Sequence, residues 1–332
     1  MIANDITHFI GNTPLLRLKL KRADWELLLK LEKFNPGQSM KDRMGLNMIS
    51  DAETKNKLKV GETVIESSSG NTAISLALIC AVKRYKFIAV VDHHAQIEKI
   101  NTIKAYGGKV VYVDSSRYAS DEVAVAERER LATKLAEETP NSVFLHQACN
   151  EANRDAYEDT LAAEIAKEVP DMNIFFAAIG TTGSICGTSR GLKKLGLKSR
   201  TIAVEPKGSI FFSKEGGPYF QSGTGNPPGA QLPKILDYSV IDEGLQVTDA
   251  EAFNTCRAMA RKFGILVGGS SGGVLFKAIQ YLADRKDKGK AVVLVNDGGE
   301  RYLSTIYDDE WMRKNKLIDP NVEMIVDEIE SI

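Results

Sequence analysis

Lys41 stands where a lysine side chain could do covalent chemistry. Residues 35–43 read NPGQSMKDR, so a turn-forming Asn-Pro-Gly leads into the lysine at the start of an amphipathic stretch. Cations in the first turn of a helix face the positive end of the helix dipole, which is unfavourable without an anionic partner. A lysine held there beside a bound anion is suited to form a Schiff base with an aldehyde. The alternative is an ordinary solvated helix start, and the choice between the two depends on the other motifs of the chain.

Two further segments have the composition of ligand-binding loops that end a strand and begin a helix. Residues 66–72 read ESSSGNT, and their hydroxyl, amide and backbone N–H groups could bind a carboxylate. The alternative there is simple helix capping by Ser69 or Asn71. Residues 179–184 read IGTTGS, which could bind phosphate through backbone N–H groups and hydroxyls. This loop lacks the lysine of a P-loop and the G-x-G-x-x-G spacing of a dinucleotide site, so a monophosphate fits it better, and a tight turn is the alternative.

A third loop of this kind lies near the end of the chain. Residues 268–273 read GGSSGG before a helical stretch, and their glycines would let the backbone and one hydroxyl approach a flat ligand closely. A flexible turn with a serine cap is the alternative. In α/β folds ligands bind beyond the carboxyl ends of the strands, where helix N-termini point, so the three loops could serve one site.

The elements that must position these loops alternate between short apolar runs and longer helical patterns. The runs at 87–91 and 291–295 are apolar on consecutive residues, as in strands that are buried on both faces. The alternation predicts parallel sheets with helices on both sides, an α/β fold. The predicted strands are 26–31, 63–66, 87–92, 109–113, 173–179, 201–204 and 291–295. The predicted helices are 41–55, 71–83, 96–106, 120–138, 153–167, 184–195, 249–263 and 271–283. The polar segment after Trp311 is expected to be a peripheral tail.

The composition excludes several classes of protein. The 332 residues are 43% hydrophobic and 26% charged with a net charge of -1, which does not favour nucleic acid or a membrane surface as a partner. The four cysteines are far apart and form no C-x-x-C pair, which argues against a zinc site or a disulfide framework and fits a reducing compartment. The first residues, MIANDITH, do not read as a signal peptide. We therefore expect a cytoplasmic protein with no metal site.

Together the motifs resemble the pyridoxal-phosphate-dependent cysteine synthase and cystathionine β-synthase family. The resemblance runs from GNTPL at 11–15 to DGGERYL at 297–303. It implies a tryptophan synthase β-like fold (fold type II) with two three-layer α/β/α domains and the cofactor between them. The smaller domain would comprise residues 1–12 and 36–147. The larger domain would comprise residues 13–35 and 148–312, and residues 313–332 would form the tail. It also implies a homodimer.

The resemblance assigns roles to individual residues. Lys41 would carry pyridoxal 5'-phosphate, Asn71 would bind the phenolic oxygen of the cofactor, and Ser270 would face its pyridine nitrogen. The phosphate would be bound by Gly180, Thr181, Thr182, Gly183 and Ser184. The substrate would be bound by Ser68, Ser69, Thr72 and Gln147. Arg43 is a further substrate-binding candidate, with a structural ion pair as its favoured role.

The implied reaction is β-replacement on an O-activated L-serine. A neutral serine opposite the pyridine nitrogen leaves that nitrogen unprotonated, which favours β-elimination to an aminoacrylate. Lys41 would remove the α-proton as the base, and a nucleophile would then add at the β-carbon. The substrates would be amino acids, taken up as small molecules.

Departures from the family pattern narrow the expected substrates. VVDHH at 90–94 replaces the usual Met-Pro, the phosphate loop reads GTTGS, Ala73 replaces a glycine, and NPPG stands at 226–229. Together with AVEPKGSIFF at 203–212, these resemble N-(2-amino-2-carboxyethyl)-L-glutamate synthase of siderophore biosynthesis, which joins O-phospho-L-serine and L-glutamate on the way to diaminopropionate. A cysteine synthase using O-acetylserine or O-phosphoserine is the first alternative. A non-catalytic module on this fold and a nicotinamide-dependent dehydrogenase are the others.

Overall fold

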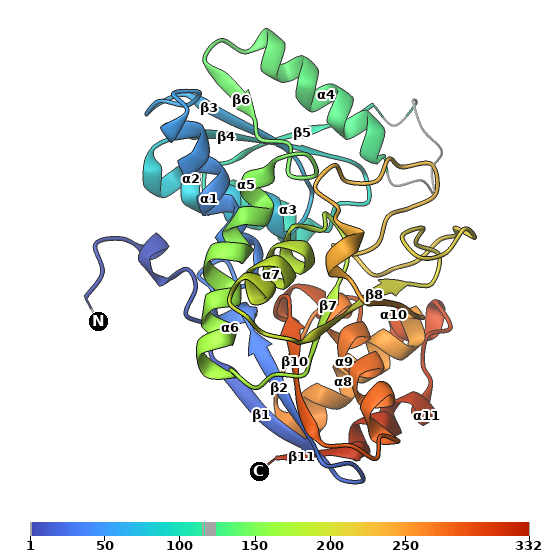
Figure 1. The fold of residues 1–332 in the computed structure, drawn as a ribbon. Helices are drawn as coiled ribbons and strands as arrows, with labels where there is room; N and C mark the ends of the chain where they lie inside the picture. Colours follow the sequence, from blue (N-terminus) through green and yellow to red (C-terminus); the bar gives the residue numbers. More distant parts are fainter. Residues whose placement is uncertain (1, 115, 117–123, 332) are drawn as a thin grey trace.

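The fold consists of two sheets with helices on both faces of each, as expected for an α/β fold (Figure 1). The structure is a computed structural model that describes residues 2–114, 116 and 124–331. The larger sheet has the strand order β11-β1-β2-β10-β7-β8-β9, and the smaller sheet has the order β5-β4-β3-β6. The smaller sheet is parallel throughout, and in the larger sheet β2, β10, β7, β8 and β9 are parallel while β1 runs antiparallel to β2 and β11.

The strands of the larger sheet are β1 (Leu15–Leu20), β2 (Trp25–Leu31), β7 (Ile174–Ala178), β8 (Arg200–Pro206), β9 (Glu243–Val247), β10 (Gly289–Val295) and β11 (Ile329–Ser331). Those of the smaller sheet are β3 (Thr63–Ser67), β4 (Lys86–Val91), β5 (Lys109–Tyr112) and β6 (Ser142–Phe144). The α-helices are α1 (Lys41–Thr54), α2 (Asn71–Lys83), α3 (Ile97–Ala105), α4 (Val125–Glu138), α5 (Glu151–Ala156), α6 (Ala162–Glu168), α7 (Gly183–Lys194), α8 (Asp249–Phe263), α9 (Gly269–Ala283), α10 (Asp309–Lys314) and α11 (Pro320–Glu323).

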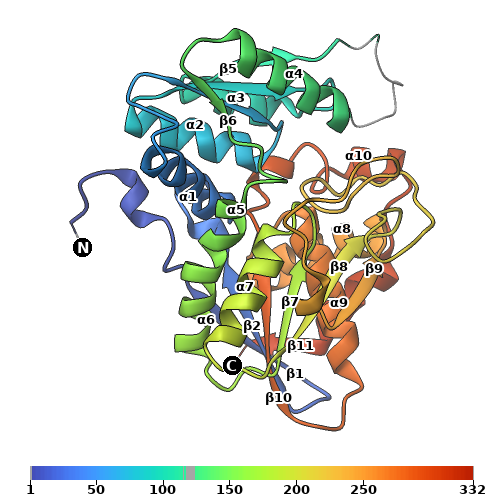
Figure 2. The ribbon, with the colours of Figure 1, turned by 45° about the horizontal axis from the view of Figure 1, so that its top comes forward.

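Side chains alternate between the two faces of each strand, and this alternation divides the hydrophobic core. In β7, Phe175 and Phe176 point to opposite faces and belong to different clusters. One cluster lies under α8, α9 and α10, while the other lies under α5, α6 and α7 on the opposite face (Figure 2). The cluster under α5, α6 and α7 continues through α1 and α2 to Val64 and Ala89 of the smaller sheet. The two sheets therefore share one continuous core, which fixes the position of α1 between them.

Every predicted strand is present, with end residues that differ by at most two. The predicted helices are also present, with two differences. Residues 120–123 of the helix predicted at 120–138 lie outside the described residues, and α4 begins at Val125. The helix predicted at 153–167 is divided into α5, a π-helical turn at Tyr157–Leu161, and α6. The strands β1, β6, β9 and β11 were not predicted.

The expectation of a peripheral C-terminal tail was wrong. Strand β11 pairs with β1, and Met312, Val326 and Ile329 are buried in the cluster under α8 and α9. Burying these apolar side chains against the larger sheet stabilises the segment more than exposing it would.

The exact boundaries of the two domains stay a prediction. Among the described residues, no helix is both long enough and apolar enough to cross a membrane.

Candidate active site

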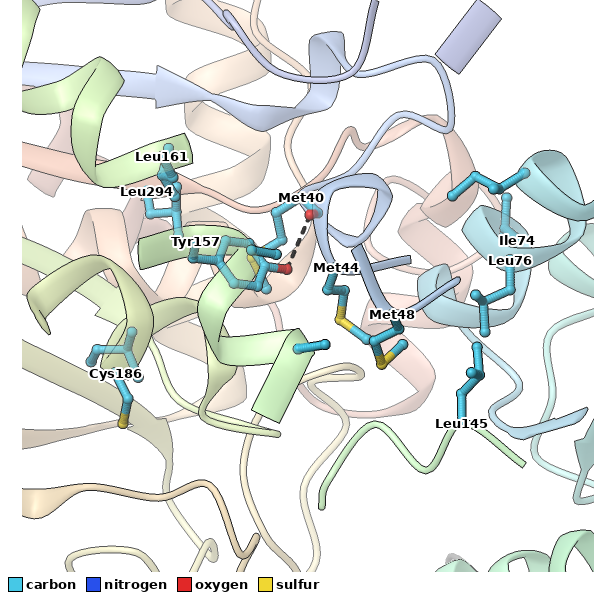
Figure 3. Packing of buried hydrophobic residues seen from close by; sticks show 14 of the residues in the cluster. Met40, Met44, Met48, Ile74, Leu76, Leu145, Tyr157, Leu161, Cys186 and Leu294 are labelled. Atoms are coloured by element: carbon cyan, nitrogen blue, oxygen red, sulfur yellow. Dashed lines mark hydrogen bonds between the residues drawn. The ribbon is translucent and has the colours of Figure 1, made fainter. Parts of the chain in front are cut away.

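Lys41 is the first residue of α1, and hydrogen bonds on two sides hold the backbone just before it. The backbone N–H of Met40 donates to the carbonyl of Asn296 at 2.8 Å, just after β10. On the other side, the Tyr157 hydroxyl donates to the Met40 carbonyl at 3.0 Å, within the packed core that Figure 3 shows. Helix α1 itself packs against α2 and α5. The lysine is thus held at a helix start whose backbone is fixed on both sides.

The amine of Lys41 is suited to act as a base near neutral pH. The residue is only 8% exposed. Burial lowers its pKa from the ordinary value of 10.5 to about 8, although the nearby Asp297 carboxylate acts in the opposite direction. A lysine with a lowered pKa is uncharged more of the time, and the uncharged amine is the form that attacks aldehydes and accepts protons.

This pKa predicts how the stability of the cofactor-free protein depends on pH. Because the pKa of Lys41 is about 8 when folded and 10.5 when exposed, the unfolded chain binds more protons between these values. The free energy of unfolding of the wild type, relative to that of Lys41→Met, should therefore rise as the pH rises from about 8 to 10.5. Urea unfolding of both proteins across this range measures the difference. A difference that does not change with pH would contradict the lowered pKa.

The serine-rich loop after β3 lies beside Gln147, as the predicted substrate site requires. The Thr72 hydroxyl donates to Oε1 of Gln147 at 2.7 Å, and Nε2 of Gln147 donates to the Ser67 carbonyl at 3.4 Å. Ser68 is buried, and its hydroxyl accepts from the backbone N–H of Gly70 at 3.2 Å. The Ser69 hydroxyl accepts from Arg128 at 3.4 Å. The predicted substrate residues are therefore neighbours in space, although their roles stay predictions.

Asn71 begins α2 and connects this loop to the larger sheet. Its Nδ2 donates to Oδ2 of Asp297 at 2.7 Å, and its Oδ1 accepts from Nη1 of Arg301 at 2.8 Å. Arg301 also donates through Nη2 to the Gly37 carbonyl at 2.7 Å, in the turn before Lys41. The orientation of the Asn71 amide is fixed by these two partners. Because an amide nitrogen has two hydrogens, one remains available for an oxygen acceptor such as the phenolic oxygen of the cofactor.

The loop from β7 to α7 has the features of a phosphate site. Thr182 has a φ of +68°, which is rare for a residue with a side chain, and its buried hydroxyl has no hydrogen-bond partner among the described residues. Gly183 must be glycine, because a Cβ there would lie 2.2 Å from Oδ1 of Asn153. Nδ2 of Asn153 donates to the Thr181 hydroxyl at 3.3 Å. The free N–H groups at the start of α7 and the unpartnered hydroxyl together fit a phosphate group.

Ser270 offers a neutral hydrogen-bond donor in the first turn of α9. It is buried, and its Oγ accepts from Nδ2 of Asn296 at 2.9 Å. Because the oxygen already accepts a hydrogen bond, the hydroxyl hydrogen is free to donate. A ring nitrogen that carries no proton can accept that hydrogen bond. Ser270 thus fits the pyridine nitrogen of pyridoxal phosphate.

The groups predicted to bind the cofactor lie at the carboxyl ends of strands from both sheets. The loops follow β3 and β7, while Asp297 follows β10. Around them lie the cations Lys41, Lys99 and Arg301. Cations grouped in one place favour an anionic ligand. The residues therefore fit pyridoxal phosphate, with Lys41 for its aldehyde and the β7–α7 loop for its phosphate.

Several residues of the site were not predicted as functional, namely Lys99, Arg128, Asp297 and Arg301. The last two lie in the DGGERYL run that carried the family resemblance, so a signal for them was present. Lys99 and Arg128 lie within ordinary amphipathic helices, and no sequence signal marked them as functional. Arg43 is not in the site. It forms ion pairs with Glu32 and Glu164, which confirms the structural role favoured for it.

Comparisons with known proteins agree with the geometry. The family described as pyridoxal-phosphate dependent enzyme matches residues 6–298. A Sinorhizobium fredii protein named as a cysteine synthase is 46% identical over 328 residues, 98% of this chain and 97% of that protein. A hydrogen sulfide-producing enzyme from Fusobacterium nucleatum superposes with a TM-score of 0.85 at 36% identity, covering 91% of this chain and 100% of that one. O-ureido-L-serine synthase superposes with a TM-score of 0.85 at 31% identity, covering 94% and 100%.

The similarity confirms the fold, the cofactor and the class of reaction. The fold is the tryptophan synthase β-like fold of fold type II enzymes, and the cofactor is pyridoxal phosphate. The protein is an enzyme that carries out β-replacement. The roles of individual site residues rest on the geometry described above. The chain belongs to the pyridoxal-phosphate-dependent cysteine synthase and cystathionine β-synthase family.

Proposed function

We propose that this enzyme replaces the phosphate of O-phospho-L-serine with the amino group of L-glutamate. The product would be N-(2-amino-2-carboxyethyl)-L-glutamate, a precursor of diaminopropionate in siderophore biosynthesis. We further propose that the enzyme is a cytoplasmic homodimer. Both substrates are strongly anionic, so the proposal requires cationic groups around the substrate loop beyond those that serve the cofactor.

The observation that carries the proposal is the position of Arg128. Its Nη1 donates to Oδ2 of Asp92 at 2.9 Å and to the Ser69 hydroxyl at 3.4 Å, beside the predicted carboxylate loop. The side chain is 12% exposed, and its Nε is buried with no hydrogen-bond partner among the described residues. A guanidinium with a free donor can bind a phosphate or carboxylate strongly and with defined geometry. Sulfide offers no such group for it to bind.

Each group at the site would have a separate role in the reaction. The cofactor supplies the electron sink that makes the α-proton and the β-substituent of the substrate labile. Ser68, Ser69, Thr72 and Gln147 would hold the α-carboxylate of the substrate. Lys41, with its lowered pKa, would take the α-proton. Arg128 would bind a carboxylate of the incoming glutamate.

The second candidate function is cysteine synthesis with sulfide as the nucleophile. It is favoured by the cysteine synthase name of the Sinorhizobium fredii relative and by its 46% identity over nearly the full length of both chains. Against it, one structural neighbour at 31% identity is named O-ureido-L-serine synthase. Proteins of this architecture are therefore also named for products other than cysteine. Both candidates begin with β-elimination. They differ in the nucleophile that follows and, for a synthase that uses O-acetylserine, in the leaving group as well.

Product identification separates the two candidates. We expect purified holoenzyme given O-phosphoserine, L-glutamate and sulfide together to form mainly the glutamate adduct, which mass spectrometry identifies. Arg128→Gln should lower kcat/KM for O-phosphoserine with glutamate by about tenfold or more, since it removes a charged hydrogen bond to substrate. Arg130→Gln is the control, because Arg130 lies on the same helix, is exposed and pairs with Glu127. Cysteine as the sole product would contradict the proposal.

A further inference from the structure

A buried aspartate, Asp297, connects the parts of the active site that come from different sheets. It follows β10 and is 2% exposed. Its backbone forms a β-bridge with Ser39, two residues before Lys41. Its side chain reaches Asn71 at the start of α2, on the side of the smaller sheet. Asp297 therefore contacts both the segment that presents the lysine and the residue predicted to bind the phenolic oxygen of the cofactor.

The two carboxylate oxygens of Asp297 have different surroundings. Oδ2 accepts from Nδ2 of Asn71 and from the Tyr302 hydroxyl, both at 2.7 Å. Oδ1 is buried and has no hydrogen-bond partner among the described residues. A Cβ at position 268 would lie only 2.1 Å from this Oδ1. Position 268 must therefore be glycine as long as the carboxylate keeps its place. A buried carboxylate oxygen without a donor is costly unless cations lie nearby.

Two buried amines lie in the same region, although neither forms an ion pair with the carboxylate within 4 Å. The Asp297 carboxylate raises the pKa of both Lys41 and Lys99, although burial has the larger effect and lowers both to about 8. Lys99 is 4% exposed and lies on α3, beside the smaller sheet. Its Nζ lies 4.8 Å from the centre of the Tyr302 ring and 3.3 Å from the Ser222 hydroxyl, both on the side of the larger sheet. The same tyrosine donates its hydroxyl to Asp297.

The carboxylate and its neighbours thus form one connected group, which comprises Lys41, Asn71, Lys99, Asp297, Arg301 and Tyr302. We propose that Asp297 is a positioning residue for the cofactor site, which fixes the Asn71 amide through a hydrogen bond and places a buried negative charge in the same region as the Lys41 and Lys99 amines. The effect is indirect, since Asp297 acts through Asn71 and Lys41. Removing its charge should therefore alter the binding and the electronic environment of the cofactor.

Variants at position 297 test the two contributions separately. Asp297→Asn keeps an acceptor for Asn71 and Tyr302 but removes the charge, while Asp297→Leu removes both. We expect cofactor-free Asp297→Leu protein to bind pyridoxal phosphate about ten- to a hundredfold more weakly than the wild type, with Asp297→Asn in between. In both variants the visible absorbance maximum of the bound cofactor should be displaced. Neither readout uses phosphoserine or glutamate, so the outcome does not depend on the proposed nucleophile.

A second pair of variants keeps the test decisive if Asp297→Leu does not fold. Lys99→Met should also weaken cofactor binding and displace the absorbance, because it removes one of the two amines beside the carboxylate. Lys104→Met is the matched control, since Lys104 is exposed near the end of the same helix and should behave as the wild type. The proposal is overturned if Asp297→Asn and Lys99→Met keep wild-type affinity and absorbance. It is also overturned if they only lower the melting temperature of the cofactor-free protein.

Discussion

Lys41→Ala is expected to lose covalent cofactor binding and to lower β-replacement activity by about a thousandfold or more. The side chain is both the amine that joins the cofactor and the proposed base for the α-proton, and loss of a positioned base alone costs 10²- to 10⁴-fold. The visible absorbance of the purified protein reports the covalent bond, and the rate of product formation reports the activity.

Lys55→Ala is the control for this variant. Lys55 is exposed at the end of the same helix and pairs with Asp51, so its loss should leave both the absorbance and the activity unchanged. If Lys41→Ala kept the wild-type visible spectrum, another lysine would carry the cofactor, and the assignment of the site would fail.

Arg43→Met is expected to destabilise the protein by about 3–5 kcal/mol while leaving the chemistry of the site in place. The Arg43 side chain is 1% exposed; its Nε lies 2.7 Å from Glu32 and its Nη1 lies 2.6 Å from Glu164. Without the guanidinium, the fully buried Glu32 carboxylate loses its ion pair in a region of low dielectric. Urea unfolding of the cofactor-free protein measures the free energy of unfolding.

Arg130→Met provides the comparison for this change. Its ion pair with Glu127 is solvent-exposed, and such pairs contribute at most about 1 kcal/mol. A loss of less than about 1 kcal/mol in Arg43→Met, together with a raised KM for substrate, would contradict the structural role and restore Arg43 as a substrate-binding residue.

The sequence predicted the strands of the sheet interiors well, because their apolar runs are long and uninterrupted. Residues 87–91 and 291–295 are examples, and both lie in central strands that are buried on two faces. The missed strands β1, β9 and β11 lie at or next to the edges of the larger sheet, and β6 has only three residues. Short strands near an edge depend on pairing with distant partners, which a local pattern does not show.

The C-terminal segment was misjudged for a related reason. Its apolar residues are irregularly spaced among charged and polar ones, so the sequence shows no helical or strand period. Their burial depends on β1 and α8, which are far away in the chain. The π-helical turn at Tyr157–Leu161 was not predicted either. The hydroxyl of its tyrosine donates to the carbonyl of Met40, 117 residues away in the chain.

The candidate site was predictable where its residues lie in compact loops. Consecutive small polar residues indicated that the loops at 66–72 and 179–184 bind a ligand. The prediction of Gln147 rested on the family resemblance alone. Lys99 and Arg128 could not be found in this way, because a single charged residue in an amphipathic helix normally faces solvent. Only the packing of α3 and α4 against the strand ends turns these two side chains inward.

The most direct test of the Lys41 assignment is to locate the bond between protein and cofactor. Holoenzyme would be reduced with borohydride, which makes an imine permanent, then digested and analysed by peptide mass spectrometry. We expect a single pyridoxyl-modified peptide, which carries the group on Lys41. A modification on Lys99 or any other lysine, or recovery of unmodified Lys41 from cofactor-loaded protein, would contradict it.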